Sequence, residues 1–194
     1  MNEAKSQYND GMGQYIDGFN LVRAASAGLL LAMGSAAATE RVEAGFSSDG
    51  SAEALVLRVV DSARSGLDVA AYVFTSAKIA KAIERAAARG VSVRVALDAK
   101  VAGGKYSVAT FFSNHGIPTR LDGAHAIHHH KFMVVDGKSV LTGSFNFTSS
   151  AAQKNAENAI VIWNDKDLAA RYAAEFDLHW SHATPAKASL KEQP

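Results

Sequence analysis

Short apolar runs alternate with amphipathic helical patterns over residues 41–182, and this alternation limits the fold more than any other feature of the sequence. The run LDVAAYVF at Leu67–Phe74 is almost continuously apolar, which is typical of a strand covered on both faces. The segment before it has apolar residues at the i, i+3, i+4, i+7 spacing of one helix face, at Ala52, Leu55, Val56, Val59, Val60 and Ala63. Strands and helices in alternation predict a layered α/β/α sandwich around a mostly parallel mixed sheet.

The remaining elements follow from the same patterns. Further strands are predicted at Val42–Phe46, Val91–Leu97, Pro118–Leu121 and Asn158–Trp163, with a β-hairpin at Lys131–Gly143. Further helices are predicted at Ser76–Arg89, Val108–Asn114 and Asp167–Trp180.

The charge balance restricts the function. Lysine and arginine number 20 among the 194 residues and aspartate and glutamate number 19, so the formal net charge is +1. This excludes the basic excess of proteins that coat nucleic acid, and any phosphate-binding site must therefore be local. The absence of cysteine excludes a disulfide framework, thiolate metal ligands and a cysteine nucleophile.

The N-terminal region contains an uncharged run at Ala24–Thr39 with a leucine-rich centre at Leu29–Leu31. It resembles a secretory signal and is shorter than the roughly 20 apolar residues that span a bilayer. We therefore expect an export signal over residues 1–38, one folded domain over 39–183, and a disordered polar tail over 184–194. The expected location is periplasmic or secreted, without a stable membrane span. A cytoplasmic protein with an uncleaved N-terminal helix is the alternative.

The segment HAIHHHKFMVVDGKSVLTGSFNF at His125–Phe147 contains the most informative chemistry. Asp136-Gly137 is a strong signal for a two-residue hairpin turn, which sets Val135 opposite Lys138. Opposed residues on the two strands share a face, as do residues two apart on one strand. The predicted register therefore places polar residues on one face and apolar residues on the other. The polar set is His129, Lys131, Ser144 and Asn146, and the apolar set is Phe132, Val134 and Phe145.

An imidazole, an ammonium, a hydroxyl and a carboxamide on one face suit a phosphate group. The lysine neutralises charge, the hydroxyl and amide donate hydrogen bonds, and the imidazole attacks phosphorus. Glu157 enters the next strand, and we expect it to hydrogen-bond the far nitrogen of His129 and fix its tautomer. Asp136 has the opposite parity and lies in the turn, so we interpret it as an orienting or structural residue.

The spacing of these residues resembles the signature of the phospholipase D superfamily, His129-x-Lys131-x4-Asp136, then Gly143-Ser144-x-Asn146, then Glu157-Asn158. The resemblance implies a phospholipase D-like nuclease domain that works through a phosphohistidine and needs no cofactor. It implies catalytic roles for His129, Lys131, Asp136 and Glu157, and phosphate binding by Lys131, Ser144 and Asn146. With its single motif, the chain is similar to the small bacterial EDTA-resistant endonucleases of conjugative plasmids. It is also similar to single-motif mitochondrial enzymes that act on cardiolipin or RNA.

A single motif predicts two chains. In-line displacement at phosphorus needs a second proton-transferring group, across the phosphate from the nucleophile. The other histidines lack the accompanying lysine, serine and asparagine; they are His115, His125, His128, His130, His179 and His182. We therefore expect a two-fold homodimer that apposes two copies of His129, since an isologous interface brings identical surfaces together.

Three functions are compatible with the sequence. The first is a sequence-independent endonuclease acting on DNA or RNA, the second is a phospholipase D, and the third is an inactive module that binds nucleic acid or phospholipid. A row of cations on one predicted helix and in a following loop either contacts a phosphate backbone or is a solvated face. These residues are Lys78, Lys81, Arg85, Arg89, Lys100 and Lys105.

The adjacent histidines do not predict a catalytic metal site. Neighbouring residues on a strand point to opposite faces, and the spacing matches no zinc motif. We interpret His128 and His130 as packing or rim residues and place His125 at the mouth of the cleft.

Overall fold

The computed structural model describes residues 41–102 and 107–188. The expected export signal at 1–38, Lys105, and the chain from residue 189 onward lie outside these residues, so export and location stay predictions. Within the described part of the chain, no helix is long and apolar enough to cross a membrane.

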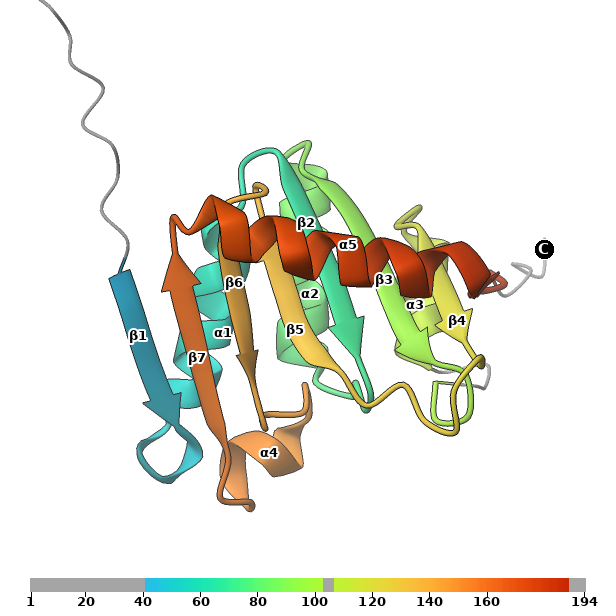
Figure 1. The fold of residues 1–194 in the computed structure, drawn as a ribbon. Coiled ribbons are helices and arrows are strands. Elements are labelled where there is room, and N and C mark those ends of the chain that lie inside the picture. The colour runs from blue at the N-terminus through green and yellow to red at the C-terminus, as the bar shows by residue number, and fades with distance from the viewer. Residues whose placement is uncertain (1–40, 103–106, 189–194) are drawn as a thin grey trace, which may run out of the picture. The chain divides into compact units, whose positions relative to one another are not determined.

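Within the described residues, eight strands form one sheet in the order β1-β7-β6-β5-β2-β3-β4-β8 (Figure 1). The strands are β1 Arg41–Phe46, β2 Gly66–Ala71, β3 Ser92–Asp98, β4 Thr119–Asp122, β5 Lys131–Val135, β6 Ser139–Gly143, β7 Asn158–Trp163 and β8 Thr184–Pro185. The helices are α1 Ser51–Ser62, α2 Ala77–Ala88, α3 Val108–Asn114, α4 Ser149–Gln153 and α5 Lys166–His182, with a short 3-10 helix η1 at Ser47–Asp49. Each predicted strand and helix is present, with ends that differ by a few residues.

The sheet is mixed, as predicted, but mostly antiparallel, and this corrects the expected parallel arrangement. Strand β3 runs parallel to β2 and to β4, because the crossovers through α2 and α3 return the chain to the end of the sheet at which the preceding strand began. The other neighbouring strands pair antiparallel. The α/β class and the three layers are confirmed, since α1, α2 and α3 cover one face of the sheet and α5 crosses the other (Figure 1).

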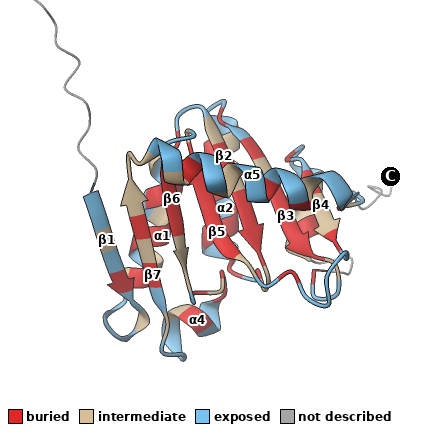
Figure 2. Cartoon of the chain, in the orientation of Figure 1, coloured by how far each residue is buried: buried red, intermediate tan, exposed pale blue. Residues whose placement is uncertain are grey.

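The apolar core has two layers, one on each face of the sheet. Met133, Val135 and Leu141 pack into the layer under α1, α2 and α3. Phe132 and Val134 alternate with them and pack under α5. Figure 2 shows the buried residues concentrated in the strands, whereas the outward side of α5 is exposed.

Helix α2 begins and ends where its sequence predicts. The Ser76 hydroxyl accepts a hydrogen bond from the Ile79 amide at 3.3 Å, which caps the first turn. Gly90 follows the last turn at φ +90°. Ile79 and Ile83 are fully buried, so this face of α2 packs against the sheet. The helix begins six residues after the carboxyl end of β2 and runs away from it.

Arg94 on β3 fastens α5 to the sheet. Its guanidinium donates to both carboxylate oxygens of Asp68 on β2, at 2.7 and 2.9 Å, and lies 2.9 Å from Asp177 of α5. The same group lies over the ring of Phe176, 4.8 Å from its centroid. A planar bidentate cation therefore joins two strands and a helix.

The expected start of the disordered tail at 184 is wrong. Thr184 and Pro185 form β8, which pairs antiparallel with β4, and the Ala186 amide donates to the Thr119 carbonyl at 2.9 Å. A two-residue edge strand tolerates proline and is too short to show periodicity in the sequence.

The hairpin of β5 and β6 forms, but its register differs by one residue from the prediction. Asp136 and Gly137 adopt φ +52° and +61°, and the Lys138 amide donates to the Val135 carbonyl at 3.0 Å. The ladder nevertheless resumes with Val135 opposite Ser139, so Lys138 remains outside it. A one-residue slip exchanges the faces of β6. As a result Phe145 packs with Met133 under the α1 to α3 layer, not with Phe132 as predicted.

Candidate active site

A cavity of about 570 Å³ opens at the edge of the sheet where β6 ends and β5 and β7 begin. Its lining residues are His129, His130, Lys131, Thr142, Gly143, Ser144, Asn146 and Glu157. Five residues predicted from the sequence thus meet at one place, namely His129, Lys131, Ser144, Asn146 and Glu157. The register predicted for the hairpin does not explain this convergence, because the observed register would place Ser144 and Lys131 on opposite faces.

A bend at Gly143 brings Ser144 and Asn146 into the same cavity as Lys131. Gly143 has φ +145°, and a Cβ atom there would lie 2.4 Å from the Asn158 carbonyl oxygen. The same oxygen accepts hydrogen bonds from the amides of Ser144 and Phe145, both at 3.1 Å. After the bend, buried Phe145 and Phe147 alternate with Ser144 and Asn146, so the phenyl rings enter the core and the polar side chains reach the cavity.

Ser144 is prepared to donate a hydrogen bond. Its Oγ accepts from the Asn158 backbone amide at 3.0 Å and from Asn158 Nδ2 at 3.3 Å. A hydroxyl has two acceptor positions and one hydrogen, so these contacts occupy both lone pairs. The remaining hydrogen is available to an anionic oxygen in the cavity.

The side chain of Lys131 is positioned by the His129 carbonyl and by the Tyr72 ring. Lys131 Nζ donates to the His129 carbonyl at 2.7 Å and lies 5.3 Å from the centroid of the Tyr72 ring. The exposed His129 ring packs against the same tyrosine, with centroids 4.8 Å apart. Burial lowers the pKa of Lys131, and the negative charge of Glu157 opposes this shift. Tyr72, which directly follows β2, was not predicted as a site residue, although it is a polar aromatic at the carboxyl end of an apolar strand.

Glu157 lines the cavity but does not make the expected bond. Its Oε1 accepts from Asn155 Nδ2 at 3.0 Å, and within the described structure no hydrogen bond joins it to His129. Asn146 Oδ1 is buried and has no hydrogen-bond partner among the described residues. A buried amide oxygen without a partner is costly, which favours a site that is completed by a ligand or by water.

A family model described as "Cardiolipin synthase, PLD-like domain" matches residues 56–180. The chain belongs to this phospholipase D-like family. The mitochondrial cardiolipin hydrolase of Mus musculus is 34% identical over 138 residues, which are 71% of this chain and 62% of that protein. A phospholipase D of Rickettsia conorii is 39% identical over 113 residues, 58% of this chain and 56% of that protein. The chain therefore spans less than two thirds of the length of these relatives.

A solved structure gives the same family assignment. Nuc from Salmonella typhimurium, a phospholipase D family member, superimposes with a TM-score of 0.75 at 39% identity. The match covers 78% of this chain and 100% of that chain. The phospholipase D-like fold predicted from the motif is confirmed.

The aspartate of the phospholipase D signature lies away from the cavity. Asp136 follows the far end of β5, and its carboxylate accepts from the backbone amides of Arg64, Ser65 and Gly66. Burial raises the pKa of Asp136, but these hydrogen bonds, of which that from Ser65 is the strongest, lower it below its usual range. The structure thus places Asp136 as a support for the start of β2, without contact to the residues that line the cavity.

The cations proposed for nucleic-acid contact do not converge on the phospholipase D-like site. Lys78 forms an ion pair with Glu53 at 2.7 Å, and Lys100 donates to the Ala126 carbonyl at 2.5 Å. Lys81 and Arg85 are exposed on α2, and Arg89 donates to carbonyls at the end of α1, away from the carboxyl end of β2. None of these described cations lines the cavity.

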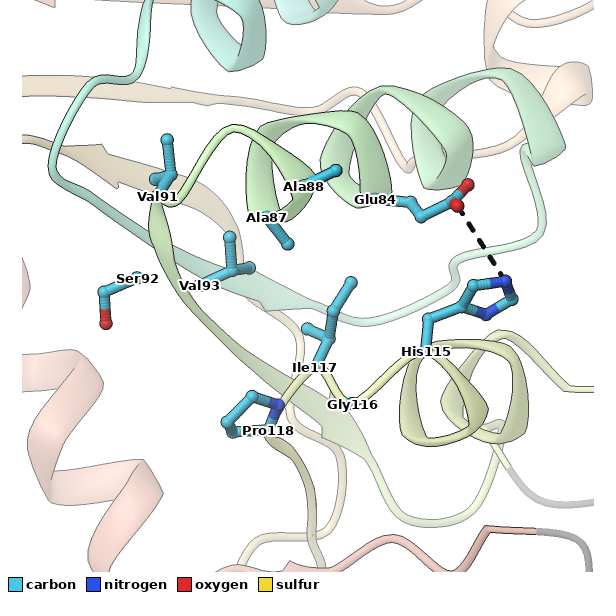
Figure 3. A pocket seen from close by; sticks show the side chains of 10 residues that line it. All are labelled: Glu84, Ala87, Ala88, Val91, Ser92, Val93, His115, Gly116, Ile117 and Pro118. Atoms are coloured by element: carbon cyan, nitrogen blue, oxygen red, sulfur yellow. Dashed lines mark ion pairs between the residues drawn. The ribbon is translucent and has the colours of Figure 1, made fainter.

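A second cavity, of about 410 Å³, lies between α2 and the turn that precedes β4 (Figure 3). Val91, Val93 and Ile117 contribute apolar walls, and His115 lies 3.9 Å from Glu84 across one end. The described residues that line it include neither lysine nor arginine, so it lacks the cationic side chains that favour phosphate binding.

Proposed function

We propose that this chain is a phosphodiesterase that cleaves nucleic acid without sequence preference and without a metal ion. The observation that carries the proposal is the cavity in which the His129 imidazole faces the same space as the Lys131 ammonium, the Ser144 hydroxyl and the Asn146 amide. A phosphodiester oxygen placed there meets one cation and two neutral donors. These groups supply the charge stabilisation that a metal ion supplies in other phosphodiesterases.

The reaction proceeds in two displacements. A ring nitrogen of His129 attacks phosphorus while the bond from phosphorus to the leaving oxygen breaks, and the leaving oxygen takes a proton. Water then attacks the phosphohistidine, loses a proton, and releases His129 and the phosphate product. Each displacement is in line, so the group that gives and takes these protons lies opposite His129. We assign this role to the partner's His129 in a homodimer.

The character of the cavity favours nucleic acid over lipid. None of the described residues that line it has an apolar side chain. A phospholipid brings acyl chains that need apolar surface, whereas a nucleic-acid strand brings a polar, charged backbone. The single motif is similar to small bacterial endonucleases and also to mitochondrial enzymes that act on cardiolipin or RNA, so the polar lining of the cavity is what favours the nuclease.

A phospholipase D is the second candidate. The relatives named phospholipase D and mitochondrial cardiolipin hydrolase favour it. Two exposed apolar residues lie near residues of the site, one along the chain and one across a backbone hydrogen bond. Ile127 is 46% exposed and precedes His129 by two residues, and Phe46 is 52% exposed beside Ser47, whose amide binds the Glu157 carbonyl.

One assay separates the candidates. Purified protein is incubated in excess EDTA with supercoiled plasmid, an RNA oligomer, and vesicles of phosphatidylcholine or cardiolipin. Nicking or RNA cleavage by the wild type and the variant His115→Ala, with loss in His129→Ala, supports the nuclease. Headgroup release without cleavage of nucleic acid supports the phospholipase. Retention of a substrate without product supports an inactive binding module.

Light scattering tests the dimer during the same assay. A fully active monomer overturns the assignment of the second proton-transferring group. Subunit exchange with His129→Ala then tests the assignment. A fall in activity per wild-type subunit supports it, because each mixed site lacks one imidazole.

A further inference from the structure

A cluster of imidazoles lies beside the cavity and has no part in the proposed reaction. It consists of His125, His128 and His130 from the segment before β5 and His179 and His182 from α5, and we call it the histidine cluster. Its rings pack edge to face, with His179 at the centre and centroids 4.6 to 5.5 Å from the other four. Two carboxylates, Asp122 and Glu175, lie among them.

Asp122 fixes the tautomer of His179. Its side chain is fully buried, and Oδ2 lies 2.7 Å from His179 Nδ1 and 2.9 Å from His128 Nδ1. A nitrogen that contacts a carboxylate must carry the hydrogen. In a neutral His179 the other nitrogen, Nε2, therefore presents a lone pair.

The lone pair on His179 Nε2 faces the carboxylate of Glu175. His179 Nε2 lies 3.1 Å from Glu175 Oε1, and His130 Nε2 lies 3.5 Å from the same oxygen. A neutral acceptor nitrogen beside a carboxylate oxygen is repulsive unless a cation lies between them. A shared proton satisfies one nitrogen, whereas a metal ion satisfies both nitrogens and the oxygen together.

The distances fit a metal ion. Ligands at about 2.0–2.1 Å around a tetrahedral zinc ion lie roughly 3.3–3.4 Å from one another, and the observed 3.1 and 3.5 Å lie on either side of this value. Glu175 and His179 are one turn apart on α5, which places both on one face. Asp122 holds the other nitrogen of His179, as carboxylates do for metal-bound histidines. We propose that His130, Glu175 and His179 bind a divalent transition-metal ion of the zinc class.

The ion would have a structural role in this arrangement. Glu175 and His179 belong to α5, while His130 lies directly between His129 and Lys131 and lines the cavity. A bond from His130 to α5 restrains the segment from which both reactive side chains project. The site is separate from the proposed chemistry, so metal binding and EDTA-resistant activity can be tested independently.

Zinc binding by untagged full-length protein is the direct test. Protein stripped with chelator is titrated with Zn²⁺ in a calorimeter and with Co²⁺ in a visible spectrometer, since tetrahedral Co²⁺ has a strong visible absorption. We expect one equivalent to bind. Because loss of a residue that merely orients a ligand already weakens binding about 10–100-fold, Glu175→Gln and His179→Gln should weaken it at least about 100-fold.

His115→Gln is the matched control. His115 also faces a glutamate, Glu84 at 3.9 Å, but it lies outside the histidine cluster and should bind as the wild type does. Glu175 is exposed, so Glu175→Gln should fold even if His179→Gln does not. Absence of binding by the wild type at 100-fold molar excess of Zn²⁺ overturns the proposal and leaves a shared proton. Binding that survives Glu175→Gln but is lost in His182→Gln also overturns this ligand set, because it places the ion elsewhere in the cluster.

Discussion

Replacing Gly143 with alanine tests whether the close approach of β6 and β7 builds the active site. A Cβ atom at Gly143 would lie 2.4 Å from the Asn158 carbonyl oxygen and 3.0 Å from the Ala159 Cα. Carbon and oxygen make ordinary close contacts at about 3.3 Å, so the strands must separate by roughly 1 Å. This shift acts on the segment that contains Ser144 and Asn146.

The expected cost follows from the bonds at this point. The Asn158 carbonyl accepts from the Ser144 and Phe145 amides, both at 3.1 Å, and a shift of about 1 Å stretches both beyond bonding distance. Each bond contributes about 1 kcal/mol to the free energy of unfolding. The φ of +145° adds about 1–3 kcal/mol of strain for a residue other than glycine. The total is about 3–5 kcal/mol, a large part of the roughly 5–15 kcal/mol of a typical domain.

Urea unfolding measures this cost against two matched glycines. Gly137 has φ +61° with open space around it, so Gly137→Ala should cost about 1–2 kcal/mol for the conformation alone. Gly66 has open space and no positive φ, so Gly66→Ala should change stability by less than about 0.5 kcal/mol. Gly143→Ala should also lose phosphodiesterase activity under conditions in which it remains folded. A cost within about 1 kcal/mol of that of Gly137→Ala would show that the close approach is unimportant.

Three further substitutions test other contacts. Asp136→Asn should cost about 1.5–3 kcal/mol at pH 7. Because hydrogen bonds lower the native pKa of Asp136, its contribution is present above the unfolded pKa of about 4 and is lost as pH falls through the lower native pKa. Urea titrations at decreasing pH should then converge, and a constant gap argues against a charged contact. Arg94→Lys should cost about 1–2 kcal/mol and speed hydrogen exchange in α5 more than in α2, so equal changes contradict its role in docking α5. Ser144→Ala should lower kcat about 100-fold through loss of one donor, and wild-type kcat would remove Ser144 from phosphate binding.

The hairpin shows how far local sequence patterns reach. Asp136 and Gly137 form the predicted turn, because both adopt the positive φ that their residue types favour. The register was wrong because a distant segment decides it. The Asp136 amide donates to the Gly66 carbonyl at 2.9 Å, and its carboxylate holds the preceding residues. Local periodicity contains no information about this contact between β5 and the start of β2.

The site residues were easier to find than their partners. The motif spacing identified His129, Lys131 and Ser144, and all three line the cavity. The predicted bond from Glu157 to His129 is absent from the described structure, and the Glu157 carboxylate accepts instead from Asn155, two residues earlier. Tyr72 is far from His129 in sequence and meets it only because β2 and β5 are neighbours in the sheet. Spacing therefore indicates which residue types act together, while strand order decides what surrounds them.

The charge within the cavity supports the proposed dimer. One chain offers the Lys131 ammonium and, on the same cavity, the Glu157 carboxylate, which together have little net charge. A phosphodiester has one negative charge, and its five-coordinate transition state gathers more on the oxygens that do not leave. Stabilisation must grow as that charge develops, so a single lysine beside a carboxylate is insufficient. Two apposed chains double the donors around one phosphorus, but they double the Glu157 carboxylate together with the Lys131 ammonium. The added positive charge in the proposed dimer therefore comes from the second imidazole, which must be protonated to act as the acid. The near-neutral composition thus fits an enzyme whose positive potential arises where two copies meet.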